Sequence, residues 1–372
     1  MKIKILLLSV VLLVLFLGSC NKSKDTNEVT PTVIPKITSP AEDEIYNTQD
    51  STTKDEKAAT IADYYPMSAD TEYVYEGKGN EYASYEQTTD FLDAANQRIQ
   101  TRTNNGGTET VRVIEIKAGK LEIIKRLNEC YYRDNFLSGT ASEDSPEVLL
   151  MEPLVQGTEW TLSDGRKRYI SGVDVPVTTP SGEYTAIEVT TENEDSASKD
   201  YYAPQVGLVK SVFQSGDMEV TSSLKTINTN KAYTKTIDIY YPDIDEKLYP
   251  EQTTLTFHTG DETKDILEAA ISKKTSKDTY LPLASINTKV NSLYLSEDGI
   301  VRVDFSKELV DDMNAGAGYE LLILQGITNT LGNYYQAQKV IITVDNKPYE
   351  SGHIMLEEGE TLQVNMDNVV NK

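Results

Sequence analysis

Cysteine and histidine are the scarcest reactive residues of this sequence. Its 372 residues include two cysteines, Cys20 and Cys130, and two histidines, His258 and His353. A metal site needs several such ligands close together, and residues this few and this scattered cannot supply them. The sequence therefore predicts neither a metal site nor a cofactor. Cys130 lies in the strand-like segment 121–132, where we expect a small buried residue, with a nucleophile as the alternative.

Basic residues are also in short supply. The chain has 35 Lys and Arg against 59 Asp and Glu, which gives a formal net charge of −24. Such a surface repels nucleic acid and anionic lipid headgroups. We therefore expect no nucleic-acid partner, while the acidity by itself names no other partner.

Long apolar runs are scarce, and the clearest one stands at the N-terminus, from Ile5 to Leu17. A membrane-spanning helix needs roughly 20 such residues, so this shorter run is typical of a signal peptide. Lys2 and Lys4 supply the basic region that precedes such a run. The run ends in Leu-Gly-Ser-Cys at positions 17–20, which resembles a bacterial lipobox.

The lipobox implies that residues 1–19 are a lipoprotein signal peptide and that Cys20 is lipidated. Acyl chains such as palmitate on Cys20 would anchor the protein to the outer face of the bacterial cell membrane. An ordinary secretory signal with an incidental cysteine is the alternative. Residues 20–63 contain this cysteine and then many Thr, Ser, Lys and acidic residues without a periodic apolar face. We expect them to form a disordered tether.

Residues 64–230 carry the alternating pattern of β-strands. Polar residues alternate with apolar or β-branched ones, and turn sequences such as Asn-Gly-Gly at 105–107 separate the runs. The pattern predicts an antiparallel meander, curved to cover its apolar face. The stretch "WTLSDGRKRYISGVDVPVTTPSGEYTAIEVTTE" resembles a β-rich domain of bacterial lipoproteins, which implies no catalytic residue. The predicted strands fall within 71–78, 109–127, 167–179, 182–192 and 207–224.

Residues from about 233 to 364 mix strands and helices in the order β-β-α-β-β-α-β. One helix is expected within 261–275, with Asp261 or Thr263 as its cap and with Ile266, Leu267, Ala270 and Ile271 on one face. The segment 290–306 reads as a hairpin. These spacings suggest one sheet with the helices packed on a face, so the whole chain is predicted to be α+β.

The stretch "AGAGYELLILQGITNTLG", residues 315–332, can be interpreted in two ways. Gly316 and Gly318 before a helix could cradle a phosphate, or they could let the helix start close to a sheet. A dinucleotide fingerprint would need glycine where Leu321 stands, and no Gly-Lys-Ser/Thr follows. We therefore expect packing glycines before a buried helix. Its exposed stripe would be Gln325, Thr328 and Asn329.

A family resemblance becomes specific in the same region. The stretches "GIVRVDFSKELVDDMNAGAGYELLILQGITNTL" and "VIITVDNKPYESGHIML" resemble the GerMN domain of sporulation and spore-germination lipoproteins. The resemblance covers roughly residues 236–360 and places a GerMN domain at 236–365. It implies a small α/β domain, similar to the ring-building motif of envelope assemblies, for which the family has no established catalytic site.

The residues that could carry catalysis do not form a known motif. His258, Asp304 and Ser306 are a nominal triad, but no Gly-x-Ser-x-Gly elbow is present. Ser306 is more simply a cap for the segment that starts at Lys307, and Asp304 a partner for backbone groups near the following helix. His353, beside a glycine, fits a turn. We therefore predict no catalytic residue and no enzyme activity.

Two further clusters have structural readings. Asp243, Asp245 and Glu246 resemble a calcium-loop fragment. The glycine at the sixth position of such a loop and the closing glutamate at the twelfth are missing, so we expect a solvated acidic turn. Tyrosine is abundant, with 23 residues against 6 phenylalanines. Tyrosine pairs could dock partners or could line half-buried strand faces. These pairs are Tyr64-Tyr65, Tyr131-Tyr132, Tyr201-Tyr202, Tyr240-Tyr241 and Tyr334-Tyr335.

Taken together, these features predict a non-catalytic cell-envelope lipoprotein. It would be held at the membrane through Cys20 and would dock or scaffold other envelope proteins, with self-association as one form of docking. The GerMN resemblance implies a role in sporulation or germination. The alternative is a carrier that holds a lipid or another apolar ligand in the curved β domain.

Overall fold

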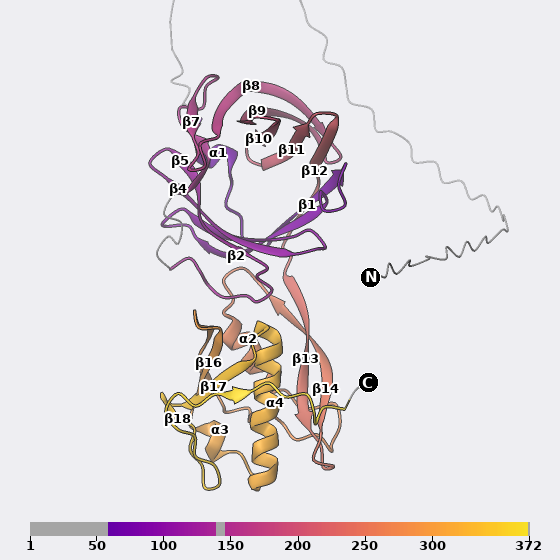
Figure 1. The fold of residues 1–372 in the computed structure, drawn as a ribbon, viewed down its shortest axis with the longest axis vertical. Coiled ribbons are helices and arrows are strands. Elements are labelled where there is room, and N and C mark those ends of the chain that lie inside the picture. Colours follow the sequence, from indigo (N-terminus) through magenta and orange to yellow (C-terminus); the bar gives the residue numbers. More distant parts are fainter. Residues whose placement is uncertain (1–58, 139–145, 371–372) are drawn as a thin grey trace, which may run out of the picture. The chain divides into compact units, whose positions relative to one another are not determined.

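The computed structural model describes residues 59–138 and 146–370. The predicted signal peptide, the lipidation site Cys20 and most of the predicted tether lie outside these residues, so those assignments stay predictions. The described residues are rich in strands and contain few helices, with one large antiparallel sheet (Figure 1). The predicted α+β class is confirmed. No helix among them is both long and apolar enough to cross a membrane.

The large sheet of the described chain has twelve strands in the order β6-β5-β4-β3-β2-β1-β12-β11-β10-β9-β8-β7. Every pairing is antiparallel, and β1 pairs with β12, so this is the predicted meander. The strands are β1 Thr71–Lys78, β2 Tyr85–Asp93, β3 Arg98–Asn104, β4 Glu109–Lys117, β5 Lys120–Asn128, β6 Glu147–Met151, β7 Glu159–Thr161, β8 Lys167–Thr179, β9 Gly182–Asn193, β10 Ser196–Ala203, β11 Gly207–Ser215 and β12 Met218–Thr229.

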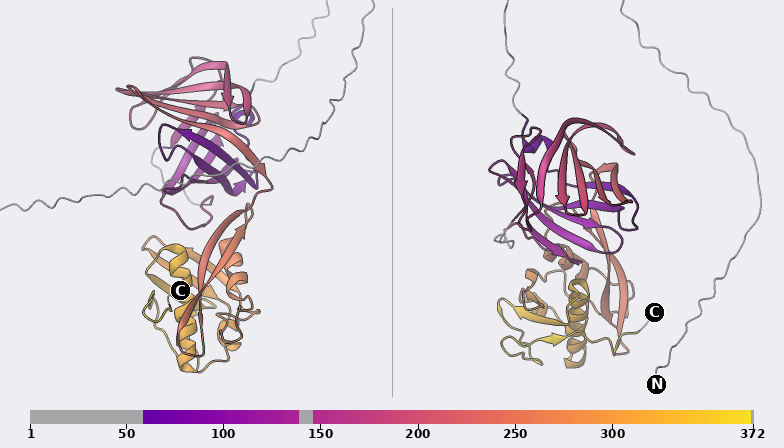
Figure 2. Two further views of the ribbon diagram at one scale, coloured as in Figure 1. Left: turned by 90° about the vertical axis from the view of Figure 1, so that its right-hand side faces the viewer. Right: turned by 45° about the horizontal axis from the view of Figure 1, so that its top comes forward.

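The sheet curls until its two edge strands approach each other (Figures 1 and 2). Side chains rather than a strand ladder join the edges. Trp160 Nε1–H on β7 donates to the Val148 carbonyl on β6 at 3.0 Å, and Arg168 Nη1 on β8 donates to the same oxygen at 2.7 Å. Arg168 Nη2 also pairs with Glu147 at 3.0 Å. These contacts satisfy edge groups that would otherwise be open to another chain.

The helix α1, Ile61–Tyr64, corrects the predicted end of the tether. Residues 61–63 were expected to be disordered, but Ile61 is fully buried in an apolar cluster with Leu121 and Trp160. Its N–H donates to Glu152 Oε1 at 3.0 Å. The apolar contacts of Ile61 offset the entropy of ordering this short segment, which the polar composition before it does not reveal.

The C-terminal part of the chain contains two sheets where one was predicted. The strands β13, Tyr233–Pro242, and β14, Leu248–Phe257, pair only with each other as a hairpin among the named strands. The second sheet has the order β15-β16-β17-β18, with β19 beside β17. Its strands are β15 Val290–Leu295, β16 Ile300–Phe305, β17 Lys339–Val344, β18 Lys347–Pro348 and β19 Leu362–Gln363, and the helices are α2 Thr263–Ile271, α3 Glu308–Asp311 and α4 Ala317–Tyr335.

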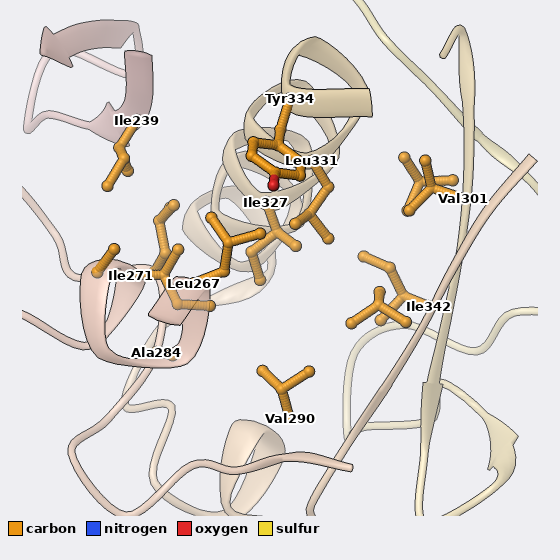
Figure 3. Packing of buried hydrophobic residues seen from close by; sticks show 14 of the residues in the cluster. Ile239, Leu267, Ile271, Ala284, Val290, Val301, Ile327, Leu331, Tyr334 and Ile342 are labelled. Carbon is orange, nitrogen blue, oxygen red and sulfur yellow. The ribbon is translucent and has the colours of Figure 1, made fainter. Parts of the chain in front are cut away.

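The helix α4 is the centre of this core (Figure 3). Ile327 and Leu331, each at most 2% exposed, lie between α2 on one side and β16 and β17 on the other. The predicted polar stripe is wrong, because Thr328 and Asn329 are fully buried. Asn329 Nδ2 donates to the Asn365 carbonyl at 2.7 Å, so a backbone partner compensates its burial. Parallel strands β16 and β17 are joined through α4, as a crossover connection requires.

The packing glycines of α4 are not the predicted ones. A methyl group at Gly316 or Gly318 would meet nothing within 4 Å. At Gly326 it would collide with the Tyr240 carbonyl and lie 2.7 Å from Leu283 Cδ2. One turn later, the Thr330 hydroxyl oxygen accepts a hydrogen bond from the Tyr240 N–H at 3.1 Å. The close approach of α4 to β13 therefore occurs in mid-helix.

The cap of α2 also differs from the prediction. Its N-cap residue is Glu262, without a side-chain cap bond. The Thr263 hydroxyl instead donates to the carbonyl of Arg133, which follows β5. Asp261 Oδ2 accepts the His258 N–H at 2.7 Å and so closes the turn before the helix. The predicted apolar face holds for Leu267, Ala270 and Ile271, which are buried, while Ile266 is partly buried.

The segment after β5 packs into the C-terminal core. The Arg133 N–H donates to Tyr334 Oη at 3.2 Å, and Tyr335 Oη–H donates to Asp134 Oδ1 at 2.9 Å. The Arg133 guanidinium donates to the carbonyls of Asp90, His258 and Asp261. A buried cation thus links the large sheet to the loop between β14 and α2.

Candidate functional site

The nominal triad does not assemble. His258 Nδ1 lies 3.1 Å from Asp70 Oδ2, and Ser306 Oγ accepts the Lys289 N–H at 3.0 Å. Ser306, just after β16, therefore bonds to the residue just before β15 and does not cap α3, whose N-cap is Lys307 without a side-chain bond. Among the hydrogen bonds of residues 59–138 and 146–370, none joins two of His258, Asp304 and Ser306.

Asp304 is a structural carboxylate. It is 3% exposed and accepts hydrogen bonds from Asn291 Nδ2 at 2.8 Å, Thr343 Oγ1 at 2.6 Å and the Asn346 N–H at 2.7 Å. The backbone group it satisfies belongs to the turn after β17, not to the start of α4 as predicted. Three donors leave little capacity for a further role in proton transfer.

The acidic cluster lies in the turn between β13 and β14. Asp243 Oδ1 accepts the Ile244 N–H at 2.6 Å, and Asp245 Oδ2 accepts Tyr249 Oη–H at 2.7 Å. In the described part of the chain, no group of three or more His, Cys, Asp or Glu side chains is placed to hold a metal ion. His353 is exposed, and its N–H donates to Ser351 Oγ at 3.0 Å in a turn, as predicted.

Cys130 is a buried free thiol, as predicted. It is 3% exposed, and its sulfur lies 3.5 Å from the Tyr132 carbonyl. Burial raises the pKa of the Cys130 thiol to about 11, although the nearby Arg102 charge opposes this rise. The thiolate that a nucleophile needs is therefore scarce at neutral pH.

The curved sheet forms a cavity of about 380 Å³. The alternative carrier function placed a ligand in this domain, but the sequence did not identify the residues that line the cavity. Its walls come from β1 to β6 on one side and from β8, β10 and β11 on the other, together with residues 65–68 before β1. This volume lies in the range of small-molecule sites, ~300–1,000 Å³. Six tyrosines line it: Tyr65, Tyr73, Tyr75, Tyr82, Tyr85 and Tyr202.

Two of these tyrosines pack against each other in the cavity wall. Tyr75 and Tyr85 stack with ring centroids 4.4 Å apart, and Tyr75 Oη–H donates to the Leu208 carbonyl at 2.7 Å. Tyr202 is 3% exposed and belongs to the apolar cluster around Ile61. The pairs Tyr240-Tyr241 and Tyr334-Tyr335 are buried in the C-terminal core. These two pairs therefore pack in the core and do not form an exposed docking surface.

One wall of the cavity changes from apolar to polar along its strands. On β3, alternate residues Ile99, Thr101 and Thr103 line the cavity, as the two-residue period of a strand requires. On β4, Thr110 and Arg112 continue this face. The polar end leads to Tyr82, which is 52% exposed. Tyr82 Cε1 would lie 2.6 Å from a methyl group at Gly107, so that glycine lets the ring pack against the β3–β4 turn.

The charged groups of the cavity are paired unequally. Glu147 pairs with Arg126 at 2.6 Å and with Arg168 at 3.0 Å. Asp200 accepts the Ser211 hydroxyl at 2.6 Å, and burial raises the pKa of the Asp200 carboxyl although Arg168 opposes this rise. The Arg112 side chain forms neither a hydrogen bond nor an ion pair within the described ranges, and its Nε is buried. Its charge also opposes the rise in the Asp200 pKa.

The carrier alternative placed a ligand in the curved β domain, but it named no residue that lines the cavity. The abundance of tyrosine is evident in the sequence, and the strand that contains Arg112 was predicted. The sequence does not show which face of a strand lies on the concave side of the curved sheet. The alternation Thr110, Arg112, Ile114 could have raised the question, because an arginine on the face shared with Ile114 is unusual in a core.

Comparisons with known proteins bear on the C-terminal part. Residues 238–350 match the family model described as Germane: Sporulation and spore germination. The resemblance to the GerMN family is thereby confirmed for this segment. No curated protein matches the chain.

Solved structures similar to this chain include the tandem GerMN domains of the sporulation protein GerM from Bacillus subtilis. The identity is 22% over 34% of this chain and 45% of that one, with a TM-score of 0.27. A candidate lipoprotein from Clostridium perfringens is 21% identical over 36% of this chain and 87% of that one, with a TM-score of 0.23. A Bacteroides fragilis protein with a YmcC-like fold is 12% identical over 45% and 99%, with a TM-score of 0.26.

Proposed function

We propose that this protein is a non-catalytic, extracytoplasmic lipoprotein that docks other envelope proteins during sporulation or spore germination. The match of residues 238–350 to the Germane family carries this proposal. The lipobox ending at Cys20 supports membrane attachment through acyl chains. The net charge of −24 disfavours a nucleic-acid partner.

The environment of the residues that could carry catalysis supports the proposal that the protein is not an enzyme. Asp304 and Ser306 hold neighbouring strands together, and Cys130 is buried with a raised pKa. The competing carrier of an apolar ligand draws support from the cavity in the curved sheet. Its threonine and arginine lining disfavours an acyl chain, because burying unpaired polar groups against hydrocarbon is costly.

Attachment and docking are tested separately. Cys20→Ala is expected to move the protein from the detergent phase to the aqueous phase in phase partitioning, because the lipid acceptor is gone. Unchanged partitioning would reject the anchor.

Docking is tested with a photo-crosslinking residue at Leu321, which is 58% exposed on α4, and with a control at Met218, which is 51% exposed in the β domain.

In sporulating cells we expect one product of defined mass from position 321 and none from position 218. The reason is that docking is assigned to the GerMN-like segment. The same products from both positions, or none from either, would count against docking. A product with twice the mass of the chain would identify a second copy as the partner.

A further inference from the structure

The cavity of the curved sheet holds polar atoms that lack partners. The hydroxyl oxygens of Thr101, Thr103 and Thr108 are buried without a hydrogen bond to the described chain, and so is Arg112 Nε. All four residues line the same cavity, three of them on the face that β3 and β4 share. Buried polar groups are nearly always satisfied, so this wall needs partners from water or from a ligand.

The charge in the cavity has an excess of one cation. Its titratable acids and bases, tyrosines aside, are Arg112, Arg126, Arg168, Glu147 and Asp200, which are three cations and two carboxylates. Arg126 and Arg168 share Glu147, while Arg112 has no ion pair in the described residues. This excess stands out in a chain of net charge −24. A guanidinium without a partner suits a carboxylate or phosphate, which it binds through two parallel hydrogen bonds.

Tyr65 and Tyr85 line the cavity together with Arg112. Burial raises the pKa of both phenols, and the Arg112 charge opposes that rise. Tyrosine side chains combine an apolar ring with a phenol hydroxyl, so they accept a ligand that carries C–H groups on its faces and polar groups at its edge. The unpaired threonine hydroxyls supply partners for several ligand hydroxyls.

We propose that this cavity binds an acidic saccharide, a sugar ring with several hydroxyls and one anionic group that pairs with Arg112. The tyrosine rings pack against the faces of the sugar, and Thr101, Thr103 and Thr108 bond to its hydroxyls. Tyr82 and the turn at Gly107 lie where the polar end of the wall meets solvent, which is the path for entry. This site is separate from the docking assigned to the GerMN-like segment, so either can fail alone.

The full chain in detergent is titrated with glucuronic acid and N-acetylmuramic acid, and with their neutral counterparts glucose and N-acetylglucosamine. Calorimetry and saturation-transfer NMR report binding. We expect at least one acid to bind about tenfold more tightly than its neutral counterpart, because only the acid offers Arg112 a partner. Equal affinity for acid and neutral sugar, or no binding of either acid, would overturn the proposal.

Two variants separate binding from folding. Arg112→Met should abolish the preference for the acid, while the control Arg166→Met, at an exposed arginine in the β7–β8 turn, should keep it. Thr103→Val should weaken binding several-fold yet leave Tm unchanged or raised, because it removes a hydroxyl that has no partner. If Thr103→Val lowered Tm and binding together, the hydroxyl would be structural and the proposal would fall.

Inorganic phosphate and palmitate test the other ligands this cavity could take. Phosphate that binds as tightly as the acidic sugars, with the same loss in Arg112→Met, would reduce the site to a simple anion site. Palmitate that binds more tightly than any sugar and is indifferent to Arg112→Met would establish an apolar carrier. Either result contradicts an acidic saccharide, and weak binding of both is the result we expect.

Discussion

Single residues decide how closely the elements of this protein approach each other. Gly326 faces the Tyr240 carbonyl so closely that β13 and α4 could not meet around any side chain. Thr330, on the same helix, accepts the neighbouring Tyr240 N–H. A helix centre is an unfavourable place for glycine, by roughly 1 kcal/mol relative to alanine, so tertiary contact accounts for it.

Gly326→Ala is therefore expected to destabilise the protein by about 1–3 kcal/mol, because the added methyl must displace β13 or Leu283. Gly318→Ala is the matched control, since a methyl there meets nothing within 4 Å and alanine favours a helix. Urea denaturation followed by circular dichroism measures both. Equal stability of the two variants would show that α4 and β13 are not in close contact.

At the scale of elements, the sequence predicted strands that are joined by glycine-containing turns. It did not predict strands whose buried face is polar. The hairpins β4–β5 and β8–β9 follow from alternation and from the turns at Gly119 and Gly182. The strands β2 and β3 lack a regular apolar face. Gln100 and Arg102 on β3 are at most 2% exposed, and they bond to Asp90 and to carbonyls of residues 130–134. Partners this distant leave no local pattern.

The helix α4 shows the same limit. Its six apolar residues from Leu321 to Leu331 predicted a buried helix, and most of it is buried. The burial of Asn329 could not be predicted, because its partner lies at Asn365 near the C-terminus. The buried Thr328 bonds to the Leu324 carbonyl one turn earlier, a contact that a threonine on an exposed helix face can also make. For the candidate site, some of the strands that carry its residues could be predicted. Which of their side chains meet around one cavity could not, because that depends on how strongly the sheet curls.

A pair of leucines on α4 tests this orientation. Leu324 is 2% exposed and Leu321 is 58% exposed. Leu324→Asp is expected to unfold the C-terminal core, because an unpaired buried charge costs several kcal/mol against a total stability of ~5–15 kcal/mol. Leu321→Asp should melt like the unchanged protein. Thermal melts followed by near-ultraviolet circular dichroism distinguish them, and cooperative melting of Leu324→Asp would place that side chain at the surface.

At the scale of the whole described chain, Arg133 ties the large sheet to the C-terminal core. Its side chain is 1% exposed and lies over the rings of Phe91 and Phe257, at 4.2 and 4.9 Å from their centroids. A cation this deep is stable only because Asp90 and three backbone carbonyls surround it. The two parts are therefore expected to unfold together, although each has its own apolar core.

Arg133→Met tests this coupling, because methionine keeps the apolar stem between the two rings and removes every donor. The carbonyls of Asp90, His258 and Asp261 would then be buried without this partner, so we expect a loss of about 3 kcal/mol. Hydrogen exchange should also quicken at the end of β14 and the start of α2. The control Arg166→Met breaks a solvent-screened ion pair with Asp164, for which little change in stability is expected. If both variants lost equally little, Arg133 would not couple the sheet to the core, and the two parts would unfold as independent units.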